Sequence, residues 1–264
     1  MEVSLSADHH CFKVDSSAFF YIWYTSSNRM DSRERANSLT PAPRAVIFDL
    51  DDTLIISTVD FRKFRSCLIE YMNRKGAKTD RFEEGETTVS MIAEFEKEMR
   101  TKGIDERKIQ HYMDEIETLL DNIELERIEE TTQIPGADEI LLILRENDIR
   151  IGVLTRGCTE YARRALEIAG LDELVDAVIS RDNKSGIAPK PDPRSALLLT
   201  EMLGVEPRET VMIGDHSIDF ACARDSGIRF FGIVSDERSR DDLRECGCQE
   251  IVSNLMDFLG RMGL

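Results

Sequence analysis

Two carboxylates, Asp49 and Asp51, stand two residues apart directly after the apolar run Ala45–Phe48. The continuous β-favouring character of that run predicts a central strand of a sheet that is covered on both faces. Unpaired carboxylates are costly to bury, so we expect a cation to compensate them. Because Mg²⁺ prefers oxygen ligands and commonly binds one or two carboxylates together with a substrate phosphate, the pair predicts phosphoryl chemistry.

A hydroxyl and an arginine follow a second apolar run, at residues 151–154. Thr155 closes this run, Arg156 comes next, and we expect Thr159 to cap a helix that begins at Glu160. A hydroxyl and free backbone N–H groups beside a helix N-terminus bind phosphate oxygens well. This segment is therefore a candidate phosphate site.

A lysine and a second pair of carboxylates also lie at predicted strand or helix ends. Lys190 stands between two prolines, and Asp192 is predicted to cap a helix with Pro193 at its first position. Asp215 and Asp219 follow another apolar run. Capping would explain either aspartate singly, but it does not explain why four aspartates, a threonine and a lysine converge on the same ends.

Strand and helix patterns alternate along the chain from Ala45 onward, with short connections. This alternation predicts an α/β fold with a doubly wound, Rossmann-like parallel sheet and right-handed crossovers, in which ligands gather at the carboxyl ends of the strands. The predicted strands are 45–48, 149–154, 177–179, 210–213 and 228–234, and the predicted helices are 137–146, 160–169, 194–203 and 218–225.

One long stretch, residues 57–133, interrupts the alternation and is too long for a loop. Its apolar residues recur at helical spacing, which is typical of a small bundle. We predict an α-helical cap domain here, called the helical insertion below, between core segments 45–56 and 134–264, and we expect it to act as a lid. The acidic stretch 105–130 is expected to be a solvated face. The apolar positions are Phe61, Phe64, Leu68 and Met72; Val89, Ile92, Phe95 and Met99; and Ile109, Tyr112, Ile116, Leu119 and Ile123.

The composition limits the classes of protein that are compatible with this chain. A net charge of −17 over 264 residues argues against nucleic-acid binding, which requires clustered Lys and Arg. No apolar run approaches the roughly 18 residues of a membrane span, and the six scattered cysteines are expected to be reduced thiols. We therefore expect a cytoplasmic protein with no membrane or nucleic-acid partner, either a monomer or a homodimer. Residues 1–44 are predicted to be a mobile N-terminal extension.

The motifs together resemble those of the haloacid dehalogenase superfamily, in the phosphatase branch that carries a helical cap between its first two motifs. The matching sequences are DLDDTL at 49–54, VLT at 153–155, PKPDP at 189–193 and GDHSID at 214–219. They occur in the order and separation of the family and are jointly specific, although each is only suggestive by itself.

The resemblance implies a two-step phosphatase mechanism. Asp49 is expected to attack phosphorus and form an aspartyl-phosphate. Asp51 is expected to protonate the leaving alcohol and then to deprotonate the water that hydrolyses the intermediate. Thr155, Arg156 and Lys190 are expected to bind the phosphate and stabilise its charge.

The resemblance also implies a Mg²⁺ cofactor. Its expected ligands are Asp49, the backbone carbonyl of Asp51, and Asp215. Asp219 is expected to ligate directly, through water, or to orient Lys190. The ion would bring the nucleophile and the phosphate together despite their like charge.

Several alternative activities stay open within and outside the superfamily. Asp51 favours phosphate-ester hydrolysis over dehalogenation, because halide leaves without a proton whereas an alkoxide needs one. A phosphomutase would keep the same residues, and a phosphonatase would need an insertion lysine such as Lys63, Lys75 or Lys97. A phosphoacceptor regulator without turnover, or an idle binding module, belongs to a different class. The insertion and Asp51 count against the regulator.

The substrate is expected to be a small-molecule phosphate, with phosphoglycolate as the nearest analogy. Arg62 and Arg65, together with Lys63, follow the first motif and are candidate contacts for a substrate carboxylate. The alternative is that they lie on a solvated helix face.

Overall fold

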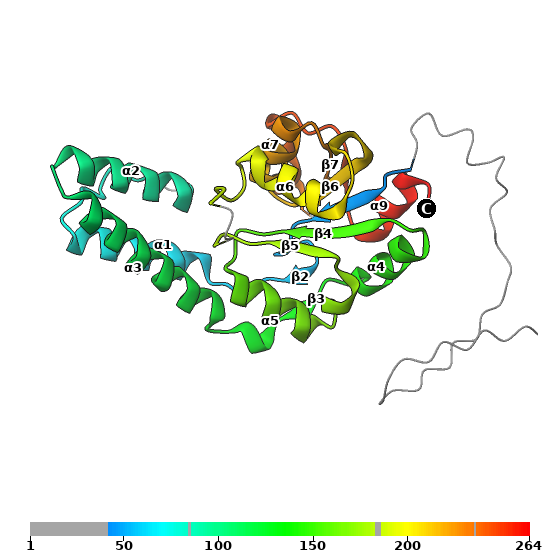
Figure 1. Cartoon of the computed structure of the whole chain (residues 1–264), viewed down its shortest axis with the longest axis horizontal. Helices are drawn as coiled ribbons and strands as arrows, with labels where there is room; N and C mark the ends of the chain where they lie inside the picture. Colours follow the sequence, from blue (N-terminus) through cyan, green and yellow to red (C-terminus); the bar gives the residue numbers. More distant parts are fainter. Residues whose placement is uncertain (1–41, 84–85, 183–185, 235) are drawn as a thin grey trace, which may run out of the picture. The chain divides into compact units, whose positions relative to one another are not determined.

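The computed structural model describes residues 42–83, 86–182, 186–234 and 236–264, all within one compact unit of the chain. Residues 1–41 of the predicted N-terminal extension lie outside the described residues. Six parallel strands form one sheet, which confirms the predicted α/β fold (Figure 1). In spatial order they are β5 (Ala177–Ile179), β4 (Arg150–Leu154), β1 (Ala45–Phe48), β6 (Thr210–Gly214), β7 (Arg229–Ile233) and β8 (Ile251–Val252).

Strand β1 lies inside the sheet and is buried on both faces. Ala45 and Ile47 belong to the apolar cluster of one face, and Val46 and Phe48 to the cluster of the other. Since β1 pairs with β4 on one side and β6 on the other, its carboxyl end is the switch point at which ligands bind in such sheets. The cluster that contains Ala45 and Ile47 includes side chains of α6 (Pro193–Leu203), α7 (Ser217–Ser226) and α8 (Glu237–Glu245). The cluster that contains Val46 and Phe48 includes side chains of α4 (Ala137–Glu146), α5 (Thr159–Ala169) and α9 (Leu255–Met262).

The helix caps test two predictions. Asp192 caps α6 by accepting a hydrogen bond from the backbone N–H of Arg194, as predicted. The predicted cap at Thr159 was wrong, because α5 begins at that residue and Cys158 is its N-cap. The Thr159 hydroxyl instead donates to Asp182, in the loop after β5, at 2.7 Å. The hydroxyl of Thr159, which was expected to cap α5, therefore has the carboxylate of Asp182 beyond β5 as its hydrogen-bond partner.

The described residues of the helical insertion form three α-helices with an apolar cluster of their own. These are α1 (Phe61–Arg74), α2 (Thr88–Thr101) and α3 (Glu106–Leu125), and their cluster is built around residues such as Leu68, Phe95 and Ile116. Strand β2 (Ile55–Ile56) pairs antiparallel with β3 (Thr132–Gln133) where the chain leaves and re-enters the core. Short 3₁₀ helices occur at Ile128–Glu130, Asp172–Leu174 and Pro207–Glu209. In the described part of the chain, no helix has both the length and the apolar character needed to cross a membrane.

Candidate active site

Three aspartates converge beyond the carboxyl ends of β1 and β6. Asp49 follows β1, Asp215 follows β6, and Asp219 lies in the first turn of α7. One carboxylate oxygen of each lies within 4.8 Å of the others. The last residue of β6 is Gly214, and a Cβ atom there would stand 2.7 Å from the Asp219 carboxyl group. Glycine is therefore what allows Asp219 to approach the strand end.

Lys190 is buried among these carboxylates, with 2% of its surface exposed. Its Nζ atom lies 2.5 Å from Asp49 Oδ1 and 2.6 Å from Asp219 Oδ1. Although burial opposes the charged form, these two carboxylates raise the pKa of Lys190. The lysine is therefore a fixed cation, as its predicted role requires, but it is a single positive charge beside three acids.

The remaining negative charge makes this cluster suited to a further cation. Burial, reinforced by the charge of Asp219, raises the pKa of Asp49 to about 7. Burial and the charges of Asp49 and Asp219 raise the pKa of Asp215 to about 9. Such shifts arise when carboxylates are crowded without enough positive charge. An all-oxygen donor set of this kind fits a hard divalent cation.

Asp51 lies beside the cluster and is held by two hydroxyl groups. The phenol of Tyr161 donates to Asp51 Oδ1 at 2.5 Å, and the hydroxyl of Ser57 donates to the same oxygen at 2.7 Å. Burial raises the pKa of Asp51, and these two hydrogen bonds oppose that rise. Asp51 is thus oriented by its neighbours and is a group that can hold or release a proton.

Tyr161 was not predicted from the sequence. It lies in the first turn of α5 and is fully buried, and a Cβ atom at Gly157 would stand 2.6 Å from its ring. The position of Tyr161 in the helix after the Thr155 motif was only a weak signal of a role in the site. Nothing in the local sequence indicates that its hydroxyl reaches Asp51, beyond the end of β1.

A cavity of about 370 Å³ lies over these groups, and both the core and the insertion line it. Of the predicted phosphate-binding residues, Arg156 and Lys190 line the cavity. Thr155 is not among its lining residues; it is buried, and its hydroxyl accepts a hydrogen bond from the Gly157 N–H at 3.0 Å. The residues predicted to act in catalysis or metal binding, namely Asp49, Asp51, Asp215 and Asp219, all line the same space.

The two arginines proposed as cap contacts are not brought to this cavity. Arg65 donates to backbone carbonyls of the insertion, at 2.6 Å to Glu83 and 2.9 Å to Glu86. Arg62 is exposed. The residues of α1 that do line the cavity are Phe61 and Phe64. Because adjacent positions on a helix point about 100° apart, the arginines that follow these phenylalanines face other directions.

Arg181 is a cavity residue that the sequence reasoning missed, although it stands two residues after β5, at the same edge of the sheet where Asp49 follows β1. It forms ion pairs with Asp121 and, at 2.5 Å, with Glu124, both on α3. Glu124 is buried, which corrects the prediction that the acidic stretch 105–130 is simply a solvated face. The ion pair with Arg181, which belongs to the core, compensates the charge of Glu124.

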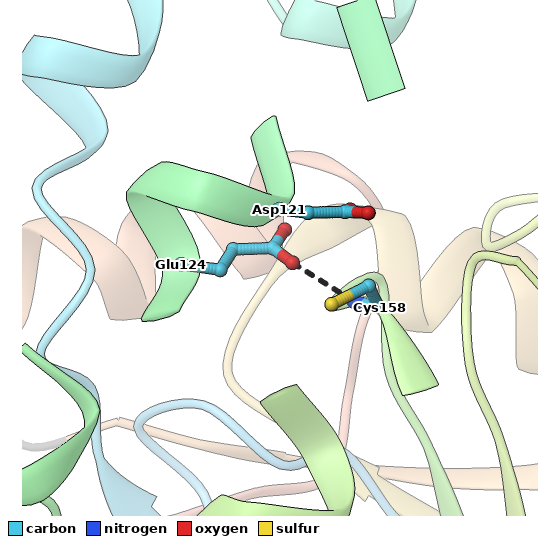
Figure 2. A group of neighbouring side chains, drawn as sticks. All are labelled: Asp121, Glu124 and Cys158. Carbon is cyan, nitrogen blue, oxygen red and sulfur yellow. Dashed lines mark hydrogen bonds between the residues drawn. The ribbon is translucent and has the colours of Figure 1, made fainter. Parts of the chain in front are cut away.

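The same two acids converge with Cys158, within 4.8 Å of one another. Figure 2 shows Glu124 extending toward Cys158, whose backbone N–H donates to it at 2.9 Å. Burial raises the pKa of the Cys158 thiol to about 12, so the sulfur stays protonated. Since the guanidinium of Arg181 already binds both carboxylates, this group is a link between insertion and core rather than a metal site.

Comparisons with known proteins agree with this geometry. Pyrophosphatase PpaX of Halalkalibacterium halodurans is 26% identical over 129 residues, which is 49% of this chain and 59% of that protein. The chain thus aligns with little more than half of that relative. Phosphoglycolate phosphatase of Rhodospirillum rubrum is 28% identical over 230 residues, covering 83% of this chain and 91% of the relative.

Solved structures share the fold. The crystal structure of a hydrolase from Pseudomonas syringae has a TM-score of 0.58 and 21% identity, covering 83% of this chain and 97% of the other. The sequence model of the haloacid dehalogenase-like hydrolases matches residues 46–233, a range that includes all but the first residue of β1, strands β2 to β7 and all the aspartates of the site. The predicted superfamily is therefore confirmed: this chain belongs to the haloacid dehalogenase-like hydrolase family.

Proposed function

We propose that this protein is a phosphatase that hydrolyses a small-molecule phosphate monoester through an aspartyl-phosphate intermediate. The observation that best supports this proposal is the pairing, in one cavity, of the buried carboxylate of Asp49 with the ammonium group of Lys190. The same cavity holds a second carboxyl group, that of Asp51, which two hydroxyl groups orient. Relatives named phosphoglycolate phosphatase and pyrophosphatase support phosphoryl chemistry.

Each proposed step assigns one task to one side chain. A carboxylate oxygen of Asp49 attacks phosphorus, and the bond from phosphorus to the ester oxygen breaks. Asp51 gives its proton to the departing alkoxide. Asp51 then takes a proton from a water molecule, whose oxygen attacks the phosphorus and releases Asp49 as a carboxylate. Lys190 and Arg156 stabilise the negative charge on the phosphoryl oxygens.

We propose Mg²⁺ as the cofactor, held by Asp49, Asp215 and Asp219 with the backbone carbonyl of Asp51. The crowding of three carboxylates around one ammonium group supports this assignment. The ion supplies positive charge that offsets the repulsion between the nucleophile and the phosphate. Asp219, which already binds Lys190, also positions that lysine.

The helical insertion, residues 57–133, is proposed to act as the cap of this site. Its side chains line one part of the cavity, and those of the core line the rest. Substrate that occupies the cavity would then be screened from water during the first step. The names of the relatives make phosphoglycolate the first compound to assay.

The test is inorganic phosphate release from a panel of phosphate monoesters that includes phosphoglycolate and p-nitrophenyl phosphate. We expect release that requires Mg²⁺, is abolished by EDTA, and falls by roughly 10⁴-fold or more in Asp49→Asn. Circular dichroism controls for folding of the variant. Undiminished turnover by a folded Asp49→Asn protein would exclude Asp49 as the nucleophile.

A further inference from the structure

Six of the eight described insertion residues that line the cavity are apolar, and the other two are Thr88 and Glu124. From this lining we infer that the organic group of the substrate is apolar and uncharged, as in a branched alkyl or aryl phosphate, rather than one that carries a second anion. The inference rests on the proposed phosphatase function and specifies its substrate class. The apolar residues are Val59, Phe61, Phe64, Val89, Ile92 and Leu120.

Two of these side chains show that this lining is not simply the core of the insertion. Phe61 is 58% exposed and Val89 is 37% exposed. The apolar core of α2 is formed by other residues of the helix, among them Met91 and Phe95, which are fully buried. An apolar group that enters the cavity would cover such exposed surface, which is favourable by about 25 cal/mol per Å².

Among the described residues, the charged groups that line the cavity leave no cation for a second anion. Six carboxylates and three cationic side chains line it. Of the cations, Lys190 is paired with Asp49 and Asp219, and Arg181 is held by two acids of α3. Arg156 is the third. Among the described residues of the insertion, no lysine or arginine lines the cavity.

Arg156 is therefore the cation left for the phosphoryl group itself. Its guanidinium donates to the Thr88 hydroxyl at 3.2 Å, and the described residues give it no ion-pair partner. Beyond the phosphate, an anionic substrate group would meet the apolar residues and the carboxylate of Glu124. Placing a carboxylate there would leave a desolvated charge without a partner, which is strongly unfavourable.

The volume is compatible with a substrate of this class. A cavity of about 370 Å³ lies at the lower end of the usual range for small-molecule sites, roughly 300 to 1,000 Å³. It has room for a phosphoryl group and a small apolar substituent.

The first test compares isosteres. In 2-methylpropyl phosphate, a branched alkyl group replaces the carboxymethyl group of phosphoglycolate with nearly the same shape, and both leaving groups are poor alkoxides. We expect kcat/KM in saturating Mg²⁺ to be at least tenfold higher for 2-methylpropyl phosphate than for phosphoglycolate, and several-fold higher than for ethyl phosphate. A higher kcat/KM for phosphoglycolate would overturn the inference.

The second test adds the missing cation to the apolar lining. Val89→Arg introduces a guanidinium at a partly exposed position of α2, and Leu142→Arg makes the same change at an exposed position of α4 that does not line the cavity. Val89→Arg is expected to shift the ratio of kcat/KM values toward phosphoglycolate by about tenfold, and Leu142→Arg to leave it unchanged. An unchanged ratio in a folded Val89→Arg protein contradicts the inference.

Failure of the substrate class and failure of the phosphatase function give different results. If the protein releases phosphate from p-nitrophenyl phosphate but prefers phosphoglycolate to its alkyl isostere, only the substrate class is wrong. If no ester, including p-nitrophenyl phosphate, yields phosphate in the presence of Mg²⁺, the phosphatase function itself is wrong and the substrate class falls with it.

Discussion

The aspartate cluster of the core and the carboxylate of Glu115 in the helical insertion experience opposite electrostatic conditions. In the core, burial and neighbouring acids raise the pKa of Asp49 and of Asp215. In the insertion, hydrogen bonds from the ammonium of Lys75 at 2.7 Å and the hydroxyl of Tyr71 at 2.8 Å lower the pKa of Glu115. The core site therefore concentrates negative charge that its own lysine does not balance, whereas Glu115 is paired with Lys75.

This difference indicates what each region contributes. Ion pairs such as Lys75–Glu115 are typical of a solvated helical bundle and contribute modestly to its stability. A cluster of acids around one buried lysine opposes folding unless a cation joins it. Such a cluster is retained where its chemistry is useful, which is why perturbed carboxylates indicate a functional site.

The largest expected effect comes from removing the central cation of the core. Lys190→Met leaves Asp49 and Asp219 buried without their shared partner, so we expect a loss of about 3–5 kcal/mol in the free energy of unfolding in EDTA. Phosphate release should fall by roughly 10³-fold. Urea titration followed by circular dichroism, and the phosphate assay, measure the two effects.

The matched variant in the insertion is Lys75→Met. It also removes a lysine from a carboxylate, but at a solvated site, so only a small loss of stability and no loss of activity are expected. Equal destabilisation by the two substitutions would show that the core cluster is no more strained than an ordinary surface pair.

The second prediction concerns pH. Between the unfolded pKa of 3.8 and about 7, folded metal-free protein keeps a proton on Asp49 that the unfolded chain has released, so stability falls as pH rises through this window. Asp49→Asn removes the titrating group and should raise the free energy of unfolding in EDTA by about 1–2 kcal/mol at pH 8, with less effect at pH 5. Thermal melting at both pH values measures this difference.

Glu115 should show the reverse dependence. Its lowered pKa means that its stabilising contribution is present above the unfolded value of 4.5 and is lost as pH falls through the folded value. Glu115→Gln is therefore expected to lower the melting temperature slightly at pH 8 and to have less effect in acid. If Asp49→Asn and Glu115→Gln both raised, or both lowered, the melting temperature at pH 8, the contrast between core and insertion would be wrong.

The sequence predicted which side chains meet at the carboxyl edge of the core sheet, because one topological rule governs their convergence. Carboxyl ends of parallel strands meet at one edge of the sheet, so placing Asp49 and Asp215 after apolar runs already predicted that they meet. Lys190 was found from its position before a predicted helix start. Local sequence thus carried most of the information about this half of the site.

The insertion was harder to predict because small rotations of a helix decide which side chains reach the cavity. Arg62 and Phe61 are neighbours in sequence, yet of the two only Phe61 lines the cavity. Glu124 looked like one acid among many, and its burial depends on Arg181, which lies 57 positions away in the chain. Periodicity gives a helix and its apolar stripe, but it does not give the partner that the helix will meet.

Two tyrosines offer the finest comparison between the regions, because each donates a hydrogen bond to a carboxylate. Tyr161 binds Asp51 at 2.5 Å in the core, and Tyr71 binds Glu115 at 2.8 Å in the insertion. Removing either hydroxyl should cost about 1 kcal/mol of stability. We expect only Tyr161→Phe to alter catalysis, because the substitution removes a hydrogen bond that orients Asp51, the proposed general acid.

The readout that separates positioning from mere stability is the dependence of kcat on the leaving group. An alkyl phosphate needs a proton from Asp51 as its alkoxide departs, whereas p-nitrophenolate leaves with little help. Tyr161→Phe should therefore lower kcat about tenfold for an alkyl phosphate and much less for p-nitrophenyl phosphate, while Tyr71→Phe changes neither. An equal loss on both substrates would mean that Tyr161 supports the fold around Asp51 without directing its proton.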